Sequence, residues 1–507
     1  MGWMGGSREC LNRLLQHRPV GPRYLTHGVP AVTTGNIPTR GPSHHGLRLQ
    51  TKYPRPPKLR KPPSQTELPA QTSFHDQESA LKLMRPIRLL VMISSMDGGG
   101  SERQTLLLLK HLDRRRFAPE LYLLHRTGSL LDQVPADVPI HCFEDAQSRS
   151  RSSSTMWNTP ITKVVSRVKR LPLPGKIHRH QVADVAAVLA QRQIDVLYDR
   201  TFHMTLIAGP AALAVGVPRV STIVSPPSRA VPLNAGRFLS IKKRRLRDAY
   251  RQSEAVIAVS HPTARDAAAF YQLPRSRFVV VANPVDSDLL DQSVATSPVP
   301  DRDNRYTIAC VGRISAEKGQ MELVQAMKKL RSDHSDQPLP RIWMIGDGPL
   351  RATLQQTVRD ENLDGSIEFI GHVAQPAPWI AIADAVCIPS YFEGFPNVML
   401  ESMALGVPVI ARSIDVVRSL GRIAADQTIR GRTYVTTFES STAEMGFDLA
   451  RKIVRTRKNS TATRSKTTSA RRLARQALSI ASGMARIERI LLKAFVDRLA
   501  EKQRQLP

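Results

Sequence analysis

The chain has 507 residues, enough for about two to four domains, which excludes a single small module. Hydrophobic residues make up 41% and charged residues 23% of the chain, which excludes overall disorder and a membrane-embedded helical bundle. Of the net charge of +30, a surplus of nine positive charges lies in residues 1–86 and a surplus of thirteen in residues 451–507. Most of the excess positive charge is therefore at the two ends of the chain.

The first 84 residues are basic and rich in proline, most densely at Pro54–Pro63. Proline removes an amide donor and fixes φ, so this composition predicts a disordered, partly extended arm. The alternative is a start assigned too far upstream, with Met84 nearer to the real beginning. Residues 1–30 do not form the apolar core of a secretory signal.

From Ile87 onward, short aliphatic runs alternate with longer amphipathic stretches, the pattern of βα units in a parallel sheet. The first group of predicted strands comprises Ile87–Ser94, Glu120–His125, Asp195–Asp199, Arg219–Val224, Ala255–Ser260 and Phe278–Ala282. The second group comprises Tyr306–Gly312, Arg341–Gly346, Ser366–Ile370, Ala385–Pro389 and Val407–Ala411. We therefore expect an α/β fold of two doubly wound, Rossmann-like domains, whose ligands bind at the carboxyl ends of the strands.

Composition divides the chain into six predicted parts. They are the arm (1–84), an N-terminal Rossmann-like domain (85–290), an exposed connector (291–303), a C-terminal Rossmann-like domain (304–455), a flexible basic segment (456–473) and a C-terminal helix (474–507). A segment rich in serine and arginine, 147–162, predicts a mobile surface loop within the first domain.

Four cysteines are scattered through the sequence, without a C-x-x-C pair and without a histidine at metal-ligand spacing. This argues against a disulfide framework and a zinc site, so we expect no metal centre and a reducing compartment. No apolar run approaches the ~20 residues that span a bilayer. Together these features predict a cytoplasmic protein.

The most specific motif runs from Pro389 to Glu401, directly after an apolar strand. Gly394 and Pro396 predict a tight turn, and the residues after it begin a helix whose free N–H groups and positive dipole end favour an anion such as pyrophosphate. Glu401 falls about two turns into this helix, where it can accept hydrogen bonds from vicinal hydroxyls, and Glu393 lies at the mouth of the site. The alternative is an ordinary capped helix with solvated carboxylates.

A second motif, Val311–Gly319, follows the first strand of the second group. Its Arg313 can bind two anionic oxygens at once, and its Lys318 acts as a point charge. Two cations in one loop after a strand suit a diphosphate. Solvated surface charges are the alternative interpretation.

These residues resemble the family 4 glycosyltransferases of the GT-B fold, most strongly across Val311–Ala411. The resemblance is carried by the G-R-x-x-x-x-K-G loop and the E-x7-E segment, and further by Gly346–Leu350, Phe369–Gly371 and Asp384. It implies a retaining transfer of a sugar from a UDP- or GDP-linked donor to a hydroxyl of a saccharide or lipid-linked acceptor, as in polysaccharide biosynthesis. It also implies that neither a metal nor another cofactor is needed.

The resemblance assigns the donor nucleotide to the C-terminal domain and the acceptor to the N-terminal one. Arg313 and Lys318 would bind the donor diphosphate, Glu393 would face the transferred sugar, and Glu401 would hold the ribose. The loop near Val373 would touch the base. Backbone amides would come from the segment formed by Gly394, Phe395, Pro396, Asn397 and Val398.

The first domain matches the family more weakly. Its Gly98–Glu102 loop, with Gly99 and Gly100, stands where the family has a G-G-x-E loop facing donor and acceptor. Val259–His261 and Asn283–Asp286 resemble the family's strand-end serine and its N-P-V-D run. Asp286 and Asp288 also mimic a metal-binding D-x-D pair, but their place beside the connector argues against that role.

The family often has a catalytic histidine near the sugar, and His203 is the candidate here, with a structural role as the alternative. The sequence also departs from the family pattern in two places. Ser225–Pro227 stands where many relatives have another histidine, and Arg412–Val417 replaces a glycine-rich turn and a glutamate. The second departure leaves open a weaker grip on the donor, altered specificity or a protein with little activity.

A basic stretch over 237–251 has the spacing of an amphipathic helix. It suits attraction to anionic lipid headgroups at the inner face of a membrane, and a solvated basic face is the alternative. Nucleic acid is disfavoured, because aromatic residues make up only 5% of the chain and do not interleave with the charges.

Two other functions remain open at the level of the sequence. One is a catalytically weak GT-B scaffold that uses its basic tails and helix to bind anionic surfaces. The other is a nucleotide-sugar epimerase or hydrolase, which would consume the donor without an acceptor.

Overall fold

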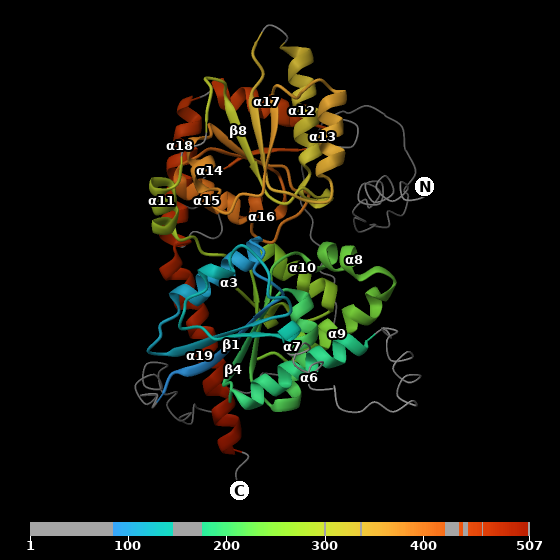
Figure 1. Ribbon diagram of the computed structural model, residues 1–507, viewed down its shortest axis with the longest axis vertical. Coiled ribbons are helices and arrows are strands. Elements are labelled where there is room, and N and C mark those ends of the chain that lie inside the picture. Colours follow the sequence, from blue (N-terminus) through green and yellow to red (C-terminus); the bar gives the residue numbers. More distant parts are fainter. Residues whose placement is uncertain are drawn as a thin grey trace, which may run out of the picture. The chain divides into compact units, whose positions relative to one another are not determined.

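The structure is a computed structural model that describes residues 85–145, 175–298, 301–334, 337–420, 435–439, 445–458 and 460–504 (Figure 1). The predicted arm over 1–84 and the predicted loop over 147–162 lie outside these residues.

Two parallel sheets form the core of the described chain. The first has the strand order β3-β2-β1-β4-β5-β6-β7 and the second the order β10-β9-β8-β11-β12-β13. In each sheet the order reverses beside the first strand, at β1/β4 and at β8/β11. Both sheets are therefore doubly wound, as predicted, and the α/β fold of two Rossmann-like halves is confirmed.

The strands of the first sheet are β1 (Ile87–Ile93), β2 (Phe117–Leu123), β3 (Ile140–Cys142), β4 (Val196–Arg200), β5 (Arg219–Ile223), β6 (Ala255–Ala258) and β7 (Phe278–Val280). Those of the second sheet are β8 (Thr307–Val311), β9 (Arg341–Ile345), β10 (Ile367–Gly371), β11 (Ala385–Ile388), β12 (Val409–Arg412) and β13 (Thr436–Phe438). Each predicted strand overlaps an observed one. The short edge strands β3 and β13 were not predicted, because polar residues interrupt both, whereas the equally short β7 is Phe-Val-Val.

Helices alternate with the strands along the chain. In the first half they are α3 (Gly100–His111), α6 (Lys176–Gln191), α7 (Phe202–Val215), α8 (Pro227–Ala235), α9 (Leu239–Gln252) and α10 (His261–Tyr271). The later helices are α11 (Ser287–Thr296), α12 (Gln320–Asp333), α13 (Arg351–Asp360), α14 (Ala377–Ile382), α15 (Asn397–Leu405), α16 (Asp415–Arg418), α17 (Phe447–Lys458), α18 (Ser460–Arg472) and α19 (Ile480–Arg504). None of the described helices has the length and apolar character that a membrane span requires.

Burial on both faces explains why the central strands are apolar runs without alternation. In β1 every residue except Arg88 is buried. The second core contains the fully buried Trp343, whose ring meets that of Trp379 edge to face at 5.1 Å.

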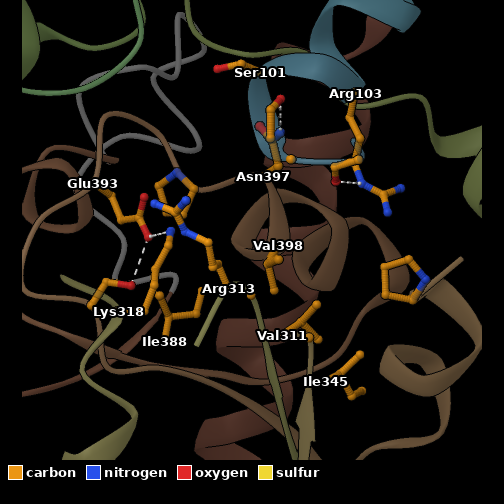
Figure 2. A pocket seen from close by; sticks show the side chains of 18 of the residues that line it. Ser101, Arg103, Val311, Arg313, Lys318, Ile345, Ile388, Glu393, Asn397 and Val398 are labelled. Atoms are coloured by element: carbon orange, nitrogen blue, oxygen red, sulfur yellow. Dashed lines mark hydrogen bonds and ion pairs between the residues drawn. The ribbon is translucent and has the colours of Figure 1, made fainter. Parts of the chain in front are cut away.

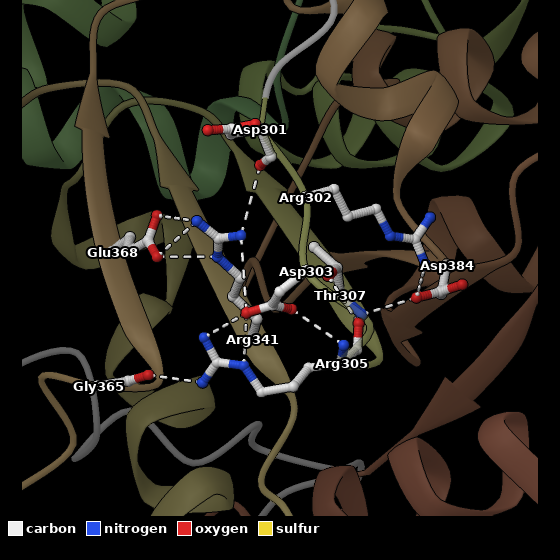
Figure 3. Close-up of polar contacts among 9 residues, drawn as sticks. All are labelled: Asp301, Arg302, Asp303, Arg305, Thr307, Arg341, Gly365, Glu368 and Asp384. Carbon is white, nitrogen blue, oxygen red and sulfur yellow. Dashed lines mark hydrogen bonds and ion pairs between the residues drawn. The ribbon is translucent and has the colours of Figure 1, made fainter.

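Charged side chains form ion pairs and hydrogen bonds at the amino ends of the strands of the second sheet (Figure 3). Arg341 and Glu368, on neighbouring strands, form a two-pronged ion pair at 2.8 and 3.0 Å. Asp384 accepts hydrogen bonds from Arg302 at 2.6 Å and from the Thr307 N–H at 2.7 Å. Asp384, part of the family pattern, therefore fixes the start of β8.

Two segments predicted to be irregular are helical. The connector predicted over 291–303 begins inside α11, which is capped by Asp286 through the Leu289 N–H at 3.0 Å and continues to Thr296. The flexible segment predicted over 456–473 is wrong for most of its length, because α18 occupies Ser460–Arg472. Its serine, threonine and arginine content concealed the apolar positions Ala470 and Leu473, which are buried in the second core.

The C-terminal helix α19 leaves the second half and returns to the first (Figure 1). Near its start the Val285 N–H donates to the Leu478 carbonyl at 2.8 Å, and Val285 and Ser479 form a parallel bridge. Farther along, the Glu488 carboxylate accepts the Asp113 N–H at 2.9 Å. Leu491 of this helix is fully buried.

We predict that Leu491→Ala lowers the free energy of unfolding by about 2–5 kcal/mol, because it leaves a cavity under α19. Leu499→Ala, at a position 38% exposed on the same helix, serves as the control and should cost less than about 1 kcal/mol. Urea unfolding followed by circular dichroism measures both values. Equal losses in the two variants would contradict the packing of α19.

Candidate functional site

The carboxyl ends of the strands of both sheets border a cleft of about 640 Å³. Most residues singled out in the sequence line it: Gly99, Gly100, Arg313, Lys318, Val373, Glu393, Phe395, Pro396, Asn397, Val398 and Glu401. Figure 2 shows how several of these side chains converge. The structure thus brings together residues that lie some 300 positions apart in the chain.

Lys318 and Glu393 are in direct contact at the cleft (Figure 2). The Lys318 Nζ lies 2.6 Å from the Glu393 Oε1, and the Ser390 hydroxyl donates to the same oxygen at 2.8 Å. Arg313 forms an ion pair with Glu317 at 3.3 Å, but its side chain is 70% exposed. The predicted diphosphate-binding cations therefore stand beside the carboxylate predicted to face the sugar.

The loops after β8 and β11, which carry these groups, are held against each other. The Tyr391 N–H donates to the Glu317 carbonyl at 2.9 Å. Gly319 has φ +67°, and a Cβ there would lie 2.4 Å from the Pro389 carbonyl oxygen. Glycine is needed at this position for its positive φ and for the close approach of the two backbones.

Helix α15 points its amino end at the cleft, with Asn397 as its first residue. No side chain of the described residues caps that end. The Met399 N–H donates to the Pro396 carbonyl at 3.2 Å, and the amides of Asn397 and Val398 are left for another acceptor. Glu401, farther along α15, also lines the cleft. Burial raises the pKa of the Glu401 carboxyl, and the nearby Arg103 opposes that shift.

The Asn397 carboxamide joins the two halves of the cleft. Its nitrogen donates to the Gly100 carbonyl at 2.9 Å, and its oxygen accepts from the Asn283 side chain at 2.9 Å. Asn283 also donates to the Phe395 carbonyl at 3.1 Å. The G-G-x-E loop of the first half and the start of α15 are consequently in contact.

Gly394 is not among the residues that line the cleft. It lies against the first half, and a Cβ there would come 1.9 Å from the Val224 carbonyl oxygen. The Thr263 hydroxyl donates to the Gly394 carbonyl at 3.4 Å. The glycine therefore permits close contact between the two halves in this arrangement.

His203, the proposed catalytic histidine, is not brought to the cleft. It lies exposed in the first turn of α7, stacked on the Phe202 ring at 4.0 Å. The strand before it instead presents Arg200 to the cleft. Sequence reasoning missed Arg200, although a charge at the carboxyl end of an apolar strand is the type of signal that could have pointed to it.

Arg412 belongs to the segment in which the sequence departs from the family pattern. Its side chain is buried and lies behind the site. Its Nε donates to the Pro389 carbonyl at 3.1 Å, and its guanidinium lies 4.4 Å from the centre of the Tyr391 ring. It also pairs at 2.5 Å with Glu322, a fully buried carboxylate that accepts the Gly446 N–H at 3.0 Å. Arg412 thus supports the loop that leads from Pro389 to Glu393.

We predict that Arg412→Met destabilises the protein by about 3–5 kcal/mol, because the variant leaves Glu322 buried and unpaired. The double variant Arg412→Met/Glu322→Leu should recover part of this loss. Lys328→Met, which breaks a 2.7 Å pair with Glu361 at a half-exposed site, should cost about 1 kcal/mol or less. Chemical denaturation of all three variants tests the coupling. A loss of similar size for Arg412→Met and Lys328→Met would contradict it.

Models of two related families match the chain. The model described as Glycosyltransferase Family 4 matches residues 98–289, and the model described as Glycosyl transferases group 1 matches residues 305–429. Together the two matches include most strands of both sheets and more than half of the chain.

Curated proteins with similar sequences include the putative teichuronic acid biosynthesis glycosyltransferase TuaC of Bacillus subtilis. It is 27% identical over 263 residues, which are 49% of this chain and 62% of that protein. The D-inositol 3-phosphate glycosyltransferase of Jonesia denitrificans is 31% identical over 183 residues, which are 32% of this chain and 42% of that protein. The match thus spans less than two thirds of either relative.

The crystal structure of Anabaena Alr3699/HepE in complex with UDP-glucose has a similar fold. It superposes with a TM-score of 0.60 at 19% sequence identity, covering 80% of this chain and 100% of that one. At this level of identity the likeness concerns the fold. Because both halves are matched by models of this family and the fold agrees, the chain belongs to the family 4, group 1 glycosyltransferases and has the GT-B fold.

Proposed function

We propose that the protein is a retaining glycosyltransferase that moves a sugar from a nucleoside diphosphate donor to an acceptor hydroxyl. The observation that carries the proposal is the contact of Lys318 with Glu393 in a cleft that the uncapped start of α15 also faces. A cation, amide donors and a carboxylate converge there. The relative HepE was crystallised with UDP-glucose, which supports a UDP-linked donor.

The donor diphosphate would bind on the second half. Arg313 is exposed enough to turn from Glu317 toward a phosphate, and its planar fork suits two phosphate oxygens. The amides at the start of α15 supply neutral donors with a favourable dipole. Glu401 would accept hydrogen bonds from the ribose hydroxyls, and Val373 would contact the base, since both line the same cleft.

In the proposed reaction the bond between the anomeric carbon and the β-phosphate oxygen breaks, and its electron pair leaves with the diphosphate. The acceptor oxygen forms the new bond from the same face, and its proton passes to the departing diphosphate. Lys318 and the α15 amides stabilise the negative charge as it develops on the leaving group, which is preorganised electrostatic catalysis. Glu393 accepts hydrogen bonds from the sugar and holds it in place. These protein groups perform the role that a divalent cation has in other transferases.

The acceptor would be a saccharide or a lipid-linked saccharide, bound mainly by the first half. Two relatives support a role in polysaccharide or phosphosugar chemistry through their names, which concern teichuronic acid and D-inositol 3-phosphate. We propose polysaccharide biosynthesis as the setting.

We predict that Lys318→Ala lowers kcat by about 10²–10³-fold, because the charge that develops on the leaving group loses one of its proposed cations. Lys328→Ala, on the same half but away from the cleft, is the control and should retain the wild-type rate. The measurement is release of UDP or GDP from a panel of nucleotide sugars with saccharide and lipid-linked acceptors. Wild-type turnover in Lys318→Ala would remove this mechanism.

The same assay separates the alternatives. An epimerase or hydrolase would consume the donor without an acceptor. A catalytically weak scaffold would show neither turnover nor thermal stabilisation by a nucleoside diphosphate. Stabilisation by UDP or GDP together with acceptor-dependent release supports the transferase.

We further propose that helices α8 and α9 dock on an anionic membrane surface. Supporting this, Leu233, Phe238 and Ile241 are large apolar side chains that are 43% to 54% exposed, and Arg244 and Arg245 are exposed beside them. No acidic residue occurs between Leu239 and Arg247 in the sequence. Exposed apolar side chains next to a purely basic segment suit the interface of an anionic bilayer.

We predict that Arg244→Gln/Arg245→Gln lowers binding to anionic liposomes by about tenfold or more, since each cation near the surface contributes ~1 kcal/mol. Ile241→Ser should weaken binding at high salt as well. Val279→Ser changes a similarly exposed apolar residue on β7 (42%) and serves as the control. Co-sedimentation with neutral and anionic liposomes measures these effects. Equal binding to neutral and anionic liposomes would contradict the proposal and favour the alternative, in which the basic face of α9 is only solvated.

A further inference from the structure

Arg200, the last residue of β4, is a buried arginine in the wall of the cleft. It is 5% exposed, and its Nε has no hydrogen-bond partner within the described part of the chain. Its other nitrogens donate to neutral oxygens, the Tyr198 Oη at 3.4 Å and the Asn283 Oδ1 at 2.9 Å. A buried cation without a counter-charge is costly, and buried donors are ordinarily satisfied. A buried guanidinium that lines a cleft, has one unsatisfied nitrogen and faces no carboxylate partner therefore indicates an anionic ligand.

The other basic side chains of the cleft have partners in the protein. Lys318 pairs with Glu393, and Arg313 pairs with Glu317. Arg103 donates to the carbonyls of Gly98 at 3.1 Å and Ala374 at 2.9 Å. Arg200, in contrast, forms no ion pair with any carboxylate of the described residues.

The surroundings of Arg200 do not offer a better internal partner. The Tyr198 hydroxyl already accepts from Thr222 at 2.8 Å. Glu102 shares the cleft, and Arg200 and Arg313 partly offset the rise that burial causes in the pKa of the Glu102 carboxyl. Glu102 is thus close enough to be influenced by the charge but does not pair with it. The position next to the guanidinium suits an external anion.

We propose that Arg200 binds a carboxylate or phosphate group on the acceptor, so that the enzyme favours acidic saccharides over neutral ones. The proposal rests on the proposed transferase function and names its acceptor class. Arg200 belongs to the first half, whereas Arg313, Lys318 and α15, the groups proposed for the donor diphosphate, belong to the second. The planar fork of arginine matches carboxylate and phosphate oxygens.

A matched pair of glycosides tests the proposal. p-Nitrophenyl glucuronide has a carboxylate where p-nitrophenyl glucoside has a hydroxymethyl group. Glucose 6-phosphate and glucose provide the equivalent pair for phosphate. Binding of each compound is measured by titration calorimetry with and without UDP. We expect the wild-type protein to bind the acidic member of each pair ~10–100-fold more tightly, the range for a hydrogen bond to a charged group.

Variants assign this preference to Arg200. In Arg200→Gln the ratio of acidic to neutral affinity should fall toward one, and Arg200→Lys should retain part of it because the charge remains. Arg229→Gln removes an exposed arginine of the same half that does not line the cleft, and it should keep the wild-type ratio. Thermal unfolding of each variant shows whether it is folded. If Arg200→Gln does not fold, the comparison of Arg200→Lys with wild type decides.

Several results would overturn the proposal. One is a wild-type protein that does not distinguish the acidic from the neutral compounds. Another is an Arg200→Gln variant that weakens UDP binding as much as it weakens glucuronide binding, which would assign Arg200 to the donor diphosphate. A preference for UDP-glucuronate over UDP-glucose that depends on Arg200 would place the acidic group on the donor. Failure of the transferase function itself appears differently, as an absence of both UDP binding and transfer.

Discussion

The Asn397 carboxamide is one of several groups that join the two halves at the point where the chemistry is proposed. Its nitrogen is committed to the Gly100 carbonyl and its oxygen to Asn283. The Asn283 bond to the Phe395 carbonyl and the Thr263 bond to the Gly394 carbonyl hold the same segment against the first half. Because Glu393 and Glu401 stand on either side of Asn397 in the sequence, these contacts together position both carboxylates relative to the first half.

The charged groups of the cleft differ in whether they have a partner of opposite charge in the protein. Lys318 and Glu393 form an ion pair, so their charges compensate each other. On the proposed mechanism, a diphosphate would take over Lys318 and release Glu393 to the sugar. Arg200 has no carboxylate partner among the described residues, and its Nε has no hydrogen-bond partner there. The Arg412–Glu322 pair is of a different nature, since it is buried behind the site and connects three segments that position it.

Most of the fold and much of the site could be predicted from the sequence, for a physical reason. Strands buried on both faces must be apolar throughout, and phosphate-binding loops need glycine and cations at fixed places beside a strand. Such features are local, and Lys318 and Glu393 were identified in this way. The strands β3 and β13 are short and contain polar residues, so they lack an apolar run. Helix α18 was concealed by polar residues on its exposed side.

The residues that sequence reasoning missed depend on contacts between distant segments. Arg412 occupies a position where the family pattern has other residues, so its supporting role was not predicted. Its partner Glu322 is 90 positions away in the sequence. His203 was predicted because the family often has a catalytic histidine, yet it lies exposed in the first turn of α7 and does not line the cleft. Arg200, three residues earlier, lacked any motif.

The route of the chain through Val285 and Ser479 also couples the two connections between the halves. In the described part of the chain, the polypeptide crosses from one half to the other near Val285 and again near Ser479. The two crossings run side by side, joined by the Val285 N–H bond to the Leu478 carbonyl and by a parallel bridge. A change in the angle between the halves would therefore have to move both crossings together or break this hydrogen bond.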